Sequence, residues 1–189
     1  MNNPASIVCR AALVLGMLWS AVAAQAATTG SGKAATEARE VSGFAAITLR
    51  GDMNLVVRQG ARESVQVTAD DNLLPLLQMV VESRGEQRTL VIQWPRGQTI
   101  RSRAKTVVTV DVVALTALAS SGSGDIAVEA LHTPELTLSI SGSSDAKLSR
   151  LDSDRLRVVI AGSGDVEHTG SAKVTQSRIA GSGSIRQRP

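Results

Sequence analysis

The sequence is poor in the side chains that build covalent and aromatic sites. Its single cysteine, Cys9, lies close to the N-terminus. The rest of the chain therefore has no thiol for a disulfide, a thiolate metal site or a cysteine nucleophile. Tyrosine is absent, and Phe44 and Trp94 are the aromatic residues beyond the first 26 positions. Aromatic-lined carbohydrate clefts and base-stacking surfaces are therefore disfavoured.

A strong charge of either sign is also lacking. Lysine and arginine total 20 and aspartate and glutamate total 17, a formal net charge of +3. This balance gives no reason to expect a nucleic-acid partner.

One apolar run stands out, "AALVLGMLWSAVAA" at Ala11–Ala24, preceded by Arg10 and followed by small residues at Ala24 and Ala26. It is shorter than the ~20 residues of a membrane-spanning helix and matches a secretory signal peptide, residues 1–26. Cys9 precedes the run, where a lipoprotein cysteine would follow it. We expect export to the periplasm, the outer surface or the medium, with no integral membrane segment after cleavage.

The remaining chain divides into a leader and one domain. Small and polar residues over 27–39 indicate a flexible leader, and regular structure is expected over 40–189. In the N-terminal half, alternating apolar residues predict strands. "DDNLLPLL" predicts a short helical turn at Leu73–Leu77. A hairpin with strands Met79–Ser83 and Thr89–Trp94 is expected to follow.

A basic stretch, "PRGQTIRSRAK", follows this hairpin and contains Arg96, Arg101 and Arg103. Charge runs usually lie on solvated loops, and that interpretation is preferred. The alternative is a surface for an anionic ligand.

The last third of the chain is repetitive. "SGSGDIAV", "SGSSDAKL", "AGSGDVEH" and "AGSGSIRQ" recur at spacings of 20, 20 and 19 residues between their first glycines. Apolar residues recur with the same period, as in the pair Leu131 and Leu151 and the series Leu136, Leu138, Ile140 and Leu156, Val158, Ile160, with Ile179 continuing the isoleucines. The fold class predicted is all-β, a right-handed parallel β-helix-like solenoid with Gly-Ser corners and, in the N-terminal half, the helical turn and hairpin.

The repeated phrase suits a tight corner. Glycine tolerates positive φ, and serine and aspartate bond neighbouring backbone groups. Glycines also let successive coils stack without clashes. The predicted structural corners are Gly122, Gly124, Asp125, Gly142, Asp145, Gly162, Gly164, Asp165, Gly181 and Gly183.

Asp125, Asp145 and Asp165 are the residues of the repeated phrase that could form a calcium site or a catalytic site. Calcium is disfavoured because one carboxylate per 20 residues is sparse for an ion that needs six or more oxygens. Catalysis is disfavoured because a catalytic pair usually interrupts a repeat. A phosphate loop lacks its lysine. No catalytic, metal or cofactor site is predicted, and His132 and His168 are expected at the surface.

The order of these elements resembles the putative auto-transporter adhesin head GIN domain family. The matching segments are "VSGFAAITLRGDMNLVVRQG", "VQVTADDNLLPLL", "TLVIQW" and the glycine-serine phrases. The resemblance implies a β-helix-like solenoid without catalytic residues and a role in adhesion or surface interaction.

We expect an exported, non-catalytic interaction module with a cell-surface or glycan partner and, through an open end of the solenoid, self-association. The alternative is a β-helix that binds or cleaves polysaccharide with Asp125, Asp145 and Asp165.

Overall fold

The computed structural model describes residues 27–188. Over that range the chain forms sixteen strands and one short 3-10 helix, η1 (Leu74–Leu76). The strands are β1 (Thr28–Thr29), β2 (Ala34–Arg39), β3 (Ala46–Gly51), β4 (Asn54–Gln59), β5 (Ser64–Asp70), β6 (Gln78–Arg84), β7 (Gln87–Gln93), β8 (Ile100–Arg101), β9 (Val107–Val112), β10 (Ala117–Gly122), β11 (Ile126–Val128), β12 (Leu131–Gly142), β13 (Ala146–Gly162), β14 (Val166–Gly170), β15 (Val174–Gly181) and β16 (Ile185–Arg188).

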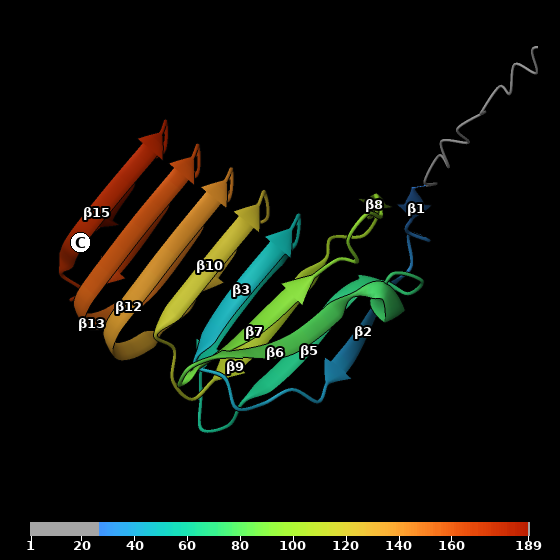
Figure 1. Cartoon of the computed structure of the whole chain (residues 1–189), viewed down its shortest axis with the longest axis horizontal. Helices are drawn as coiled ribbons and strands as arrows, with labels where there is room; N and C mark the ends of the chain where they lie inside the picture. The colour runs from blue at the N-terminus through green and yellow to red at the C-terminus, as the bar shows by residue number, and fades with distance from the viewer. Residues whose placement is uncertain (1–26, 189) are drawn as a thin grey trace, which may run out of the picture.

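Fourteen of these strands belong to one sheet, and β1 and β8 pair separately. The main path runs β2-β5-β9-β4-β11-β13-β12-β10-β3-β7-β6, while β14, β15 and β16 extend it beyond β13. The sheet curls so that β15, β13, β12, β10, β3 and β7 form a near layer, with other strands behind it (Figure 1). The path is open because its two ends, β2 and β6, do not pair with each other.

The core fills the space between the two layers. Apolar residues alternate along the strands, so one side of each strand faces inward. In the near layer Leu118, Leu138 and Val158 occupy matching positions on adjacent strands, and all three are buried. The inward positions expected from the repeat are confirmed as buried for Leu131, Leu136, Leu138, Ile140, Leu151, Leu156, Val158 and Ile160.

The predicted right-handed parallel β-helix-like solenoid is wrong. The sheet is a curled, open half-barrel that mixes parallel and antiparallel pairs: β2–β5, β5–β9 and β6–β7 are antiparallel. Its strands also depart from chain order, because β3 lies between β10 and β7. The cause lies in the non-repeating N-terminal half. Its later strands β7 and β9 pair with β3 and β4 on the side away from the repeat, and β2, β5 and β6 then add antiparallel pairs.

The repeat itself does pair in parallel. Strands β12 and β13 are in register over Leu131↔Leu151 to Gly142↔Gly162, a shift of 20 residues. Parallel pairing of equivalent residues is therefore a correct prediction, although the fold class built on it is not.

Two expectations for the N-terminal region have different outcomes. Residues 27–39 are not a flexible leader throughout, because β2 pairs antiparallel with β5 over Ala34↔Asp70 to Arg39↔Val65. The predicted hairpin is confirmed as β6 and β7, with Gly85 at positive φ in its turn. The signal peptide predicted for residues 1–26 lies outside the described residues.

Candidate functional site

The first glycine of each phrase stands in one row with Gly51. The registers are Gly51↔Gly122, Gly122↔Gly142, Gly142↔Gly162 and Gly162↔Gly181. All five have positive φ, from 120° to 155°. A Cβ on any of the last four would lie 2.0–2.2 Å from the carbonyl oxygen of the preceding corner. Glycine is therefore required here both by the backbone conformation and by the close approach of the neighbouring strand.

A second row of close approach lies two residues further on. A Cβ on Gly124, Gly164 or Gly183 would come within 2.2 Å of a backbone oxygen of Met53, Ser144 or Gly164, respectively. Ser144 replaces glycine in this row, and its hydroxyl is buried in a hydrogen bond of 2.9 Å with Ser120 Oγ.

The aspartates form a hydrogen-bonded ladder at this edge. The Asp165 N–H donates to Asp145 Oδ1 at 2.8 Å, and the Ser184 N–H and hydroxyl both donate to Asp165 Oδ1 at 2.8 Å. Asn54 makes the equivalent bond one corner earlier, because its Oδ1 accepts from the Asp125 N–H at 3.1 Å. The hydroxyl and then the N–H of Ser184 hold the pKa of Asp165 below its usual 3.8.

This ladder explains how stacked carboxylates are accommodated. Each hydrogen-bonded carboxylate holds the backbone of the following corner, and Lys147 and Arg186 line the same hollow of about 420 Å³. In the described residues, no three His, Cys, Asp or Glu side chains are grouped in a way that could hold a metal ion. The geometry gives Asp145 and Asp165 a structural use.

The two histidines have different surroundings. His132 is exposed as expected, and its Nδ1 lies 2.9 Å from Asp152 Oδ2. Ser171 Oγ donates to Asp152 Oδ1 at 2.5 Å, so the serine contacts the carboxylate rather than the imidazole. This is not the order of a catalytic triad, in which the imidazole accepts the serine proton. Ser171, followed by His132, lowers the pKa of Asp152. His168 contradicts the expectation, because it is buried.

The three arginines of the basic stretch do not form one patch. Arg101 lies in β8, which pairs with β1. Arg103 lines a hollow with Lys105, Asn54 and Asp125. Arg96 lines a different hollow on the other side of the Asp52 corner. Arg96 and Arg103 therefore line two separate hollows that share Asp52.

Arg96 belongs to what we name the corner pocket, a hollow of about 340 Å³ lined by Arg50, Gly51, Asp52, Gln93, Trp94, Arg96, Gln98 and Ile100. Trp94 packs beside Gly51, since its Cδ1 would lie 3.1 Å from a Cβ built there. Its indole Nε1 is buried and has no hydrogen-bond partner in the described residues. A buried N–H without a hydrogen-bond partner is costly.

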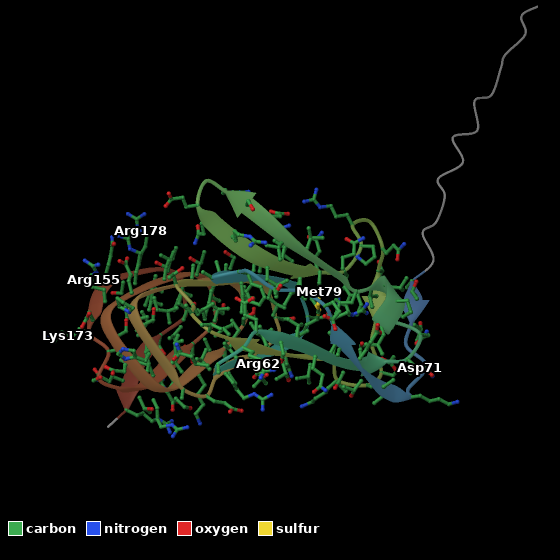
Figure 2. All side chains as sticks on the ribbon, turned by 90° about the horizontal axis from the view of Figure 1, so that it is seen from below. Arg62, Asp71, Met79, Arg155, Lys173 and Arg178 are labelled. Carbon is green, nitrogen blue, oxygen red and sulfur yellow. The ribbon has the colours of Figure 1, made fainter. Side chains whose placement is uncertain are left out.

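A second hollow, the hairpin groove, adjoins the corner pocket through Arg50. It has a volume of about 240 Å³ between the β6–β7 hairpin and the outer face of β3, β10 and β12, and its lining includes Thr48, Arg50, Glu82, Arg84, Ala119 and Ser139. The hairpin rises above the upper layer in Figure 2 and forms one wall. The side chains of β10 and β12 that line its floor are small, and include Ala117, Ala119, Thr137 and Ser139.

Arg50 is the residue that both hollows share. It is the last residue before Gly51 in β3, and its Nη1 donates to Gln93 Oε1 at 2.9 Å. Sequence reasoning missed Arg50, Arg84 and Trp94. The signal available in the sequence was "RGDMN". Its Gly51 pairs with Gly122 and so acts as a corner ahead of the repeat, and Arg50 is the residue beside that corner.

Comparisons with known proteins agree on family and fold. The sequence model of a family described as "Putative auto-transporter adhesin, head GIN domain" matches residues 43–188. No curated protein matches the chain.

Several crystal structures share the fold. A putative lipid binding protein from Parabacteroides distasonis ATCC 8503 is 18% identical with a TM-score of 0.59, covering 87% of this chain and 100% of that one. A putative adhesin from Bacteroides fragilis NCTC 9343 is 17% identical with a TM-score of 0.58, covering 85% and 99%. A putative adhesin from Parabacteroides distasonis ATCC 8503 is 19% identical with a TM-score of 0.55, covering 86% and 100%.

The described residues also include no helix of the length and apolarity needed to cross a bilayer.

Proposed function

Because the chain belongs to the putative auto-transporter adhesin, head GIN domain family, we propose that it is an exported, non-catalytic binding module for an acidic carbohydrate chain. The resemblance expected from the glycine-serine phrases is thereby confirmed. The proposed binding site is the continuous surface made by the hairpin groove and the corner pocket.

The observation that carries this proposal is the position of Arg50 between two polar hollows. Arg84 lines the groove on one side of it, and Arg96 lines the corner pocket on the other. Each hollow also has one carboxylate, Glu82 in the groove and Asp52 in the pocket, so the three arginines leave an excess of one positive charge. A guanidinium binds a carboxylate through two parallel hydrogen bonds, so arginines along a surface match a polymer with repeated carboxylates. Thr48 and Ser139 offer hydroxyls along the groove floor.

The corner pocket also contains Trp94, whose indole N–H is unpaired but buried. This N–H could donate to a sugar hydroxyl or carboxylate in the pocket only after the side chains that cover it move. Recognition would then depend on hydrogen bonds and charge, which agrees with the scarcity of aromatic side chains for stacking. The Asp125, Asp145 and Asp165 ladder is not part of this proposal.

The test uses fluorescein-labelled oligogalacturonate, a carboxylated sugar chain, with neutral oligogalactan as the matched probe. Fluorescence anisotropy should show binding of the acidic chain only, weakening as salt rises. Arg50→Gln should weaken it about tenfold, which corresponds to the loss of one charge-assisted hydrogen bond.

The matched control is Arg62→Gln, because Arg62 lies on the lower side of the molecule, away from the hairpin (Figure 2). It should change the affinity by less than about twofold, as expected for a remote exposed charge. Equal weakening by both variants would mean that the probe senses only net charge. Equal binding of the neutral probe would refute carboxylate recognition.

A further inference from the structure

The sheet has an unpaired edge at its C-terminal end. Within residues 27–188, β15 pairs only with β13, and β16 pairs only with β14. In Figure 1, β15 is the outermost strand of the near layer, beside β13. The backbone groups on its outer side therefore have no neighbouring strand.

The direction of these groups follows from the pairs that are made. The Ser182 N–H donates to the Gly162 carbonyl at 3.0 Å, next to the pair Gly162↔Gly181. Successive residues of a parallel strand direct their backbone groups to alternate sides. The pairs from Arg157↔Gln176 to Gly162↔Gly181 follow a β-bulge and are regular, so counting back from Ser182 shows that the N–H groups of Ser177 and Ile179 point toward the open edge.

The apolar row also loses its cover at this edge. Ile140 and Ile160 are 1% and 0% exposed, whereas Ile179, their equivalent on β15, is 43% exposed. One further strand with an apolar residue in this row would bury Ile179 in the same way.

The charge of the edge indicates the chemistry of that strand. Residues 171–188 contain Lys173, Arg178, Arg186 and Arg188 and no acidic residue. Arg155, Lys173 and Arg178 lie together at this end of the molecule (Figure 2), where Arg155 forms an ion pair with Glu135 at 3.2 Å. Two such edges brought together would repel each other, whereas an acidic strand would be attracted.

We propose that the β15 edge binds an extended acidic peptide segment by strand addition. The segment pairs its backbone with the outward groups of Ser177 and Ile179. Its apolar side chains cover Ile179, and its alternate carboxylates face Arg178. Backbone pairing supplies affinity and the alternation supplies specificity. This partner is distinct from the carbohydrate proposed for the hairpin groove.

The test measures binding of a fluorescein-labelled nine-residue peptide of alternating glutamate and valine at pH 7.5. Two matched peptides replace its glutamates by lysine or N-methylate alternate backbone nitrogens. The acidic peptide should bind at least tenfold more tightly than either, because the first change reverses the charge and the second removes strand pairing. Equal binding of the N-methylated peptide would overturn strand addition.

Variants locate the site. Arg178→Glu should weaken acidic-peptide binding at least tenfold, whereas Arg62→Glu and Arg50→Gln should change it less than about twofold. Equal effects of Arg178→Glu and Arg62→Glu would overturn the assignment to β15. Loss of peptide binding in Arg50→Gln would show that the peptide binds in the hairpin groove, which would also overturn the assignment.

Hydrogen exchange gives a readout in the unmodified protein. The acidic peptide should slow exchange of the Ser177 and Ile179 amides. Absence of this protection despite binding would overturn the proposal. Protection that rises with protein concentration without peptide would identify a second copy as the occupant, which would also overturn it.

Discussion

His168 is a polar residue in an apolar position. It belongs to β14 and is 1% exposed, in register with Leu148 of β13. Neither imidazole nitrogen has a hydrogen-bond partner in the part of the chain that the structure describes. Burial disfavours the charged imidazole and lowers the pKa of His168 below 6.5. The folded protein therefore holds this side chain neutral near neutral pH.

This burial predicts a dependence of stability on pH. Below about pH 6.5 the unfolded chain binds a proton at His168 that the folded chain resists, so the free energy of unfolding should decrease as pH falls from 7.5 to 5.5. His168→Leu should reduce this decrease and raise stability at pH 7.5 by about 1 kcal/mol, since it removes buried unpaired groups. Urea unfolding at several pH values measures both effects.

The exposed His132 provides the control for that experiment. His132→Gln should leave most of the pH dependence in place. Three carboxylates have lowered pKa values: Asp70, Asp152 and Asp165. Their protonation changes the free energy of unfolding only below about pH 3.8, which is outside the range of this experiment. An unchanged slope in His168→Leu would contradict the assignment.

At the scale of elements, the corners determine how closely the strands stack. The chain passes from the near layer to the rear layer after Gly122, Gly142 and Gly162. The long strand β13 spans both layers, because its first residues pair with β11 and β14 and its last residues pair with β12 and β15. Each transition begins at a glycine with positive φ whose Cα approaches the preceding carbonyl. Hydrogen bonds then connect the corners, as the Ser143 and Ser163 N–H groups donate to Gly122 and Gly142 at 2.9 Å.

Gly142→Ala should therefore be strongly destabilising. The added Cβ would lie 2.2 Å from Gly122 O at a φ of 123°, so both contact and conformation are unfavourable. We expect a loss of about 3 kcal/mol in the free energy of unfolding, measured with urea. Gly85→Ala is the matched control: its φ is 62° and a Cβ there meets nothing within 4 Å.

That control should cost about 1–2 kcal/mol, the conformational contribution alone. If the two variants were equally destabilised, close stacking at the corner would be unimportant.

At the scale of the whole molecule, Asp70 joins segments that are far apart in the sequence. Its carboxylate accepts from the Gly32 N–H at 2.6 Å and from the Arg103 and Ala104 N–H groups at 3.0 and 3.1 Å. Burial raises the pKa of Asp70, but these N–H groups and the Ser102 hydroxyl outweigh burial and lower it below 3.8. The ionised carboxylate therefore anchors the N-terminal segment and the loop before β9 to the end of β5.

Asp70→Asn should release this anchor. The amide keeps one acceptor oxygen, so it cannot hold all three N–H groups as a carboxylate does. We expect faster tryptic cleavage at the exposed Lys33, followed by mass spectrometry, with the exposed Asp154→Asn as control. In the unmodified protein the anchor is present above about pH 3.8 and is lost as pH falls below it. Cleavage at an unchanged rate would show that β2 pairing alone holds the segment.

Local patterning determined a large part of this protein. Alternation predicted which residues are buried, from Leu131 to Ile160, because side chains of a strand face opposite sides in turn. The period of 20 residues predicted that equivalent residues pair in parallel, since the same sequence makes the same turn. The order of elements was sufficient to indicate the family.

Only the tertiary structure decided what the non-repeating half does. Strand β3 inserts between β10 and β7, and the antiparallel strands β2, β5 and β6 turn an expected solenoid into an open half-barrel. Pairing between distant segments depends on the total burial and backbone pairing of the chain, which no short pattern contains. The same long-range pairing places Arg50 beside Trp94 and Arg96, buries His168, and leaves the basic edge of β15 without a neighbour in the described chain.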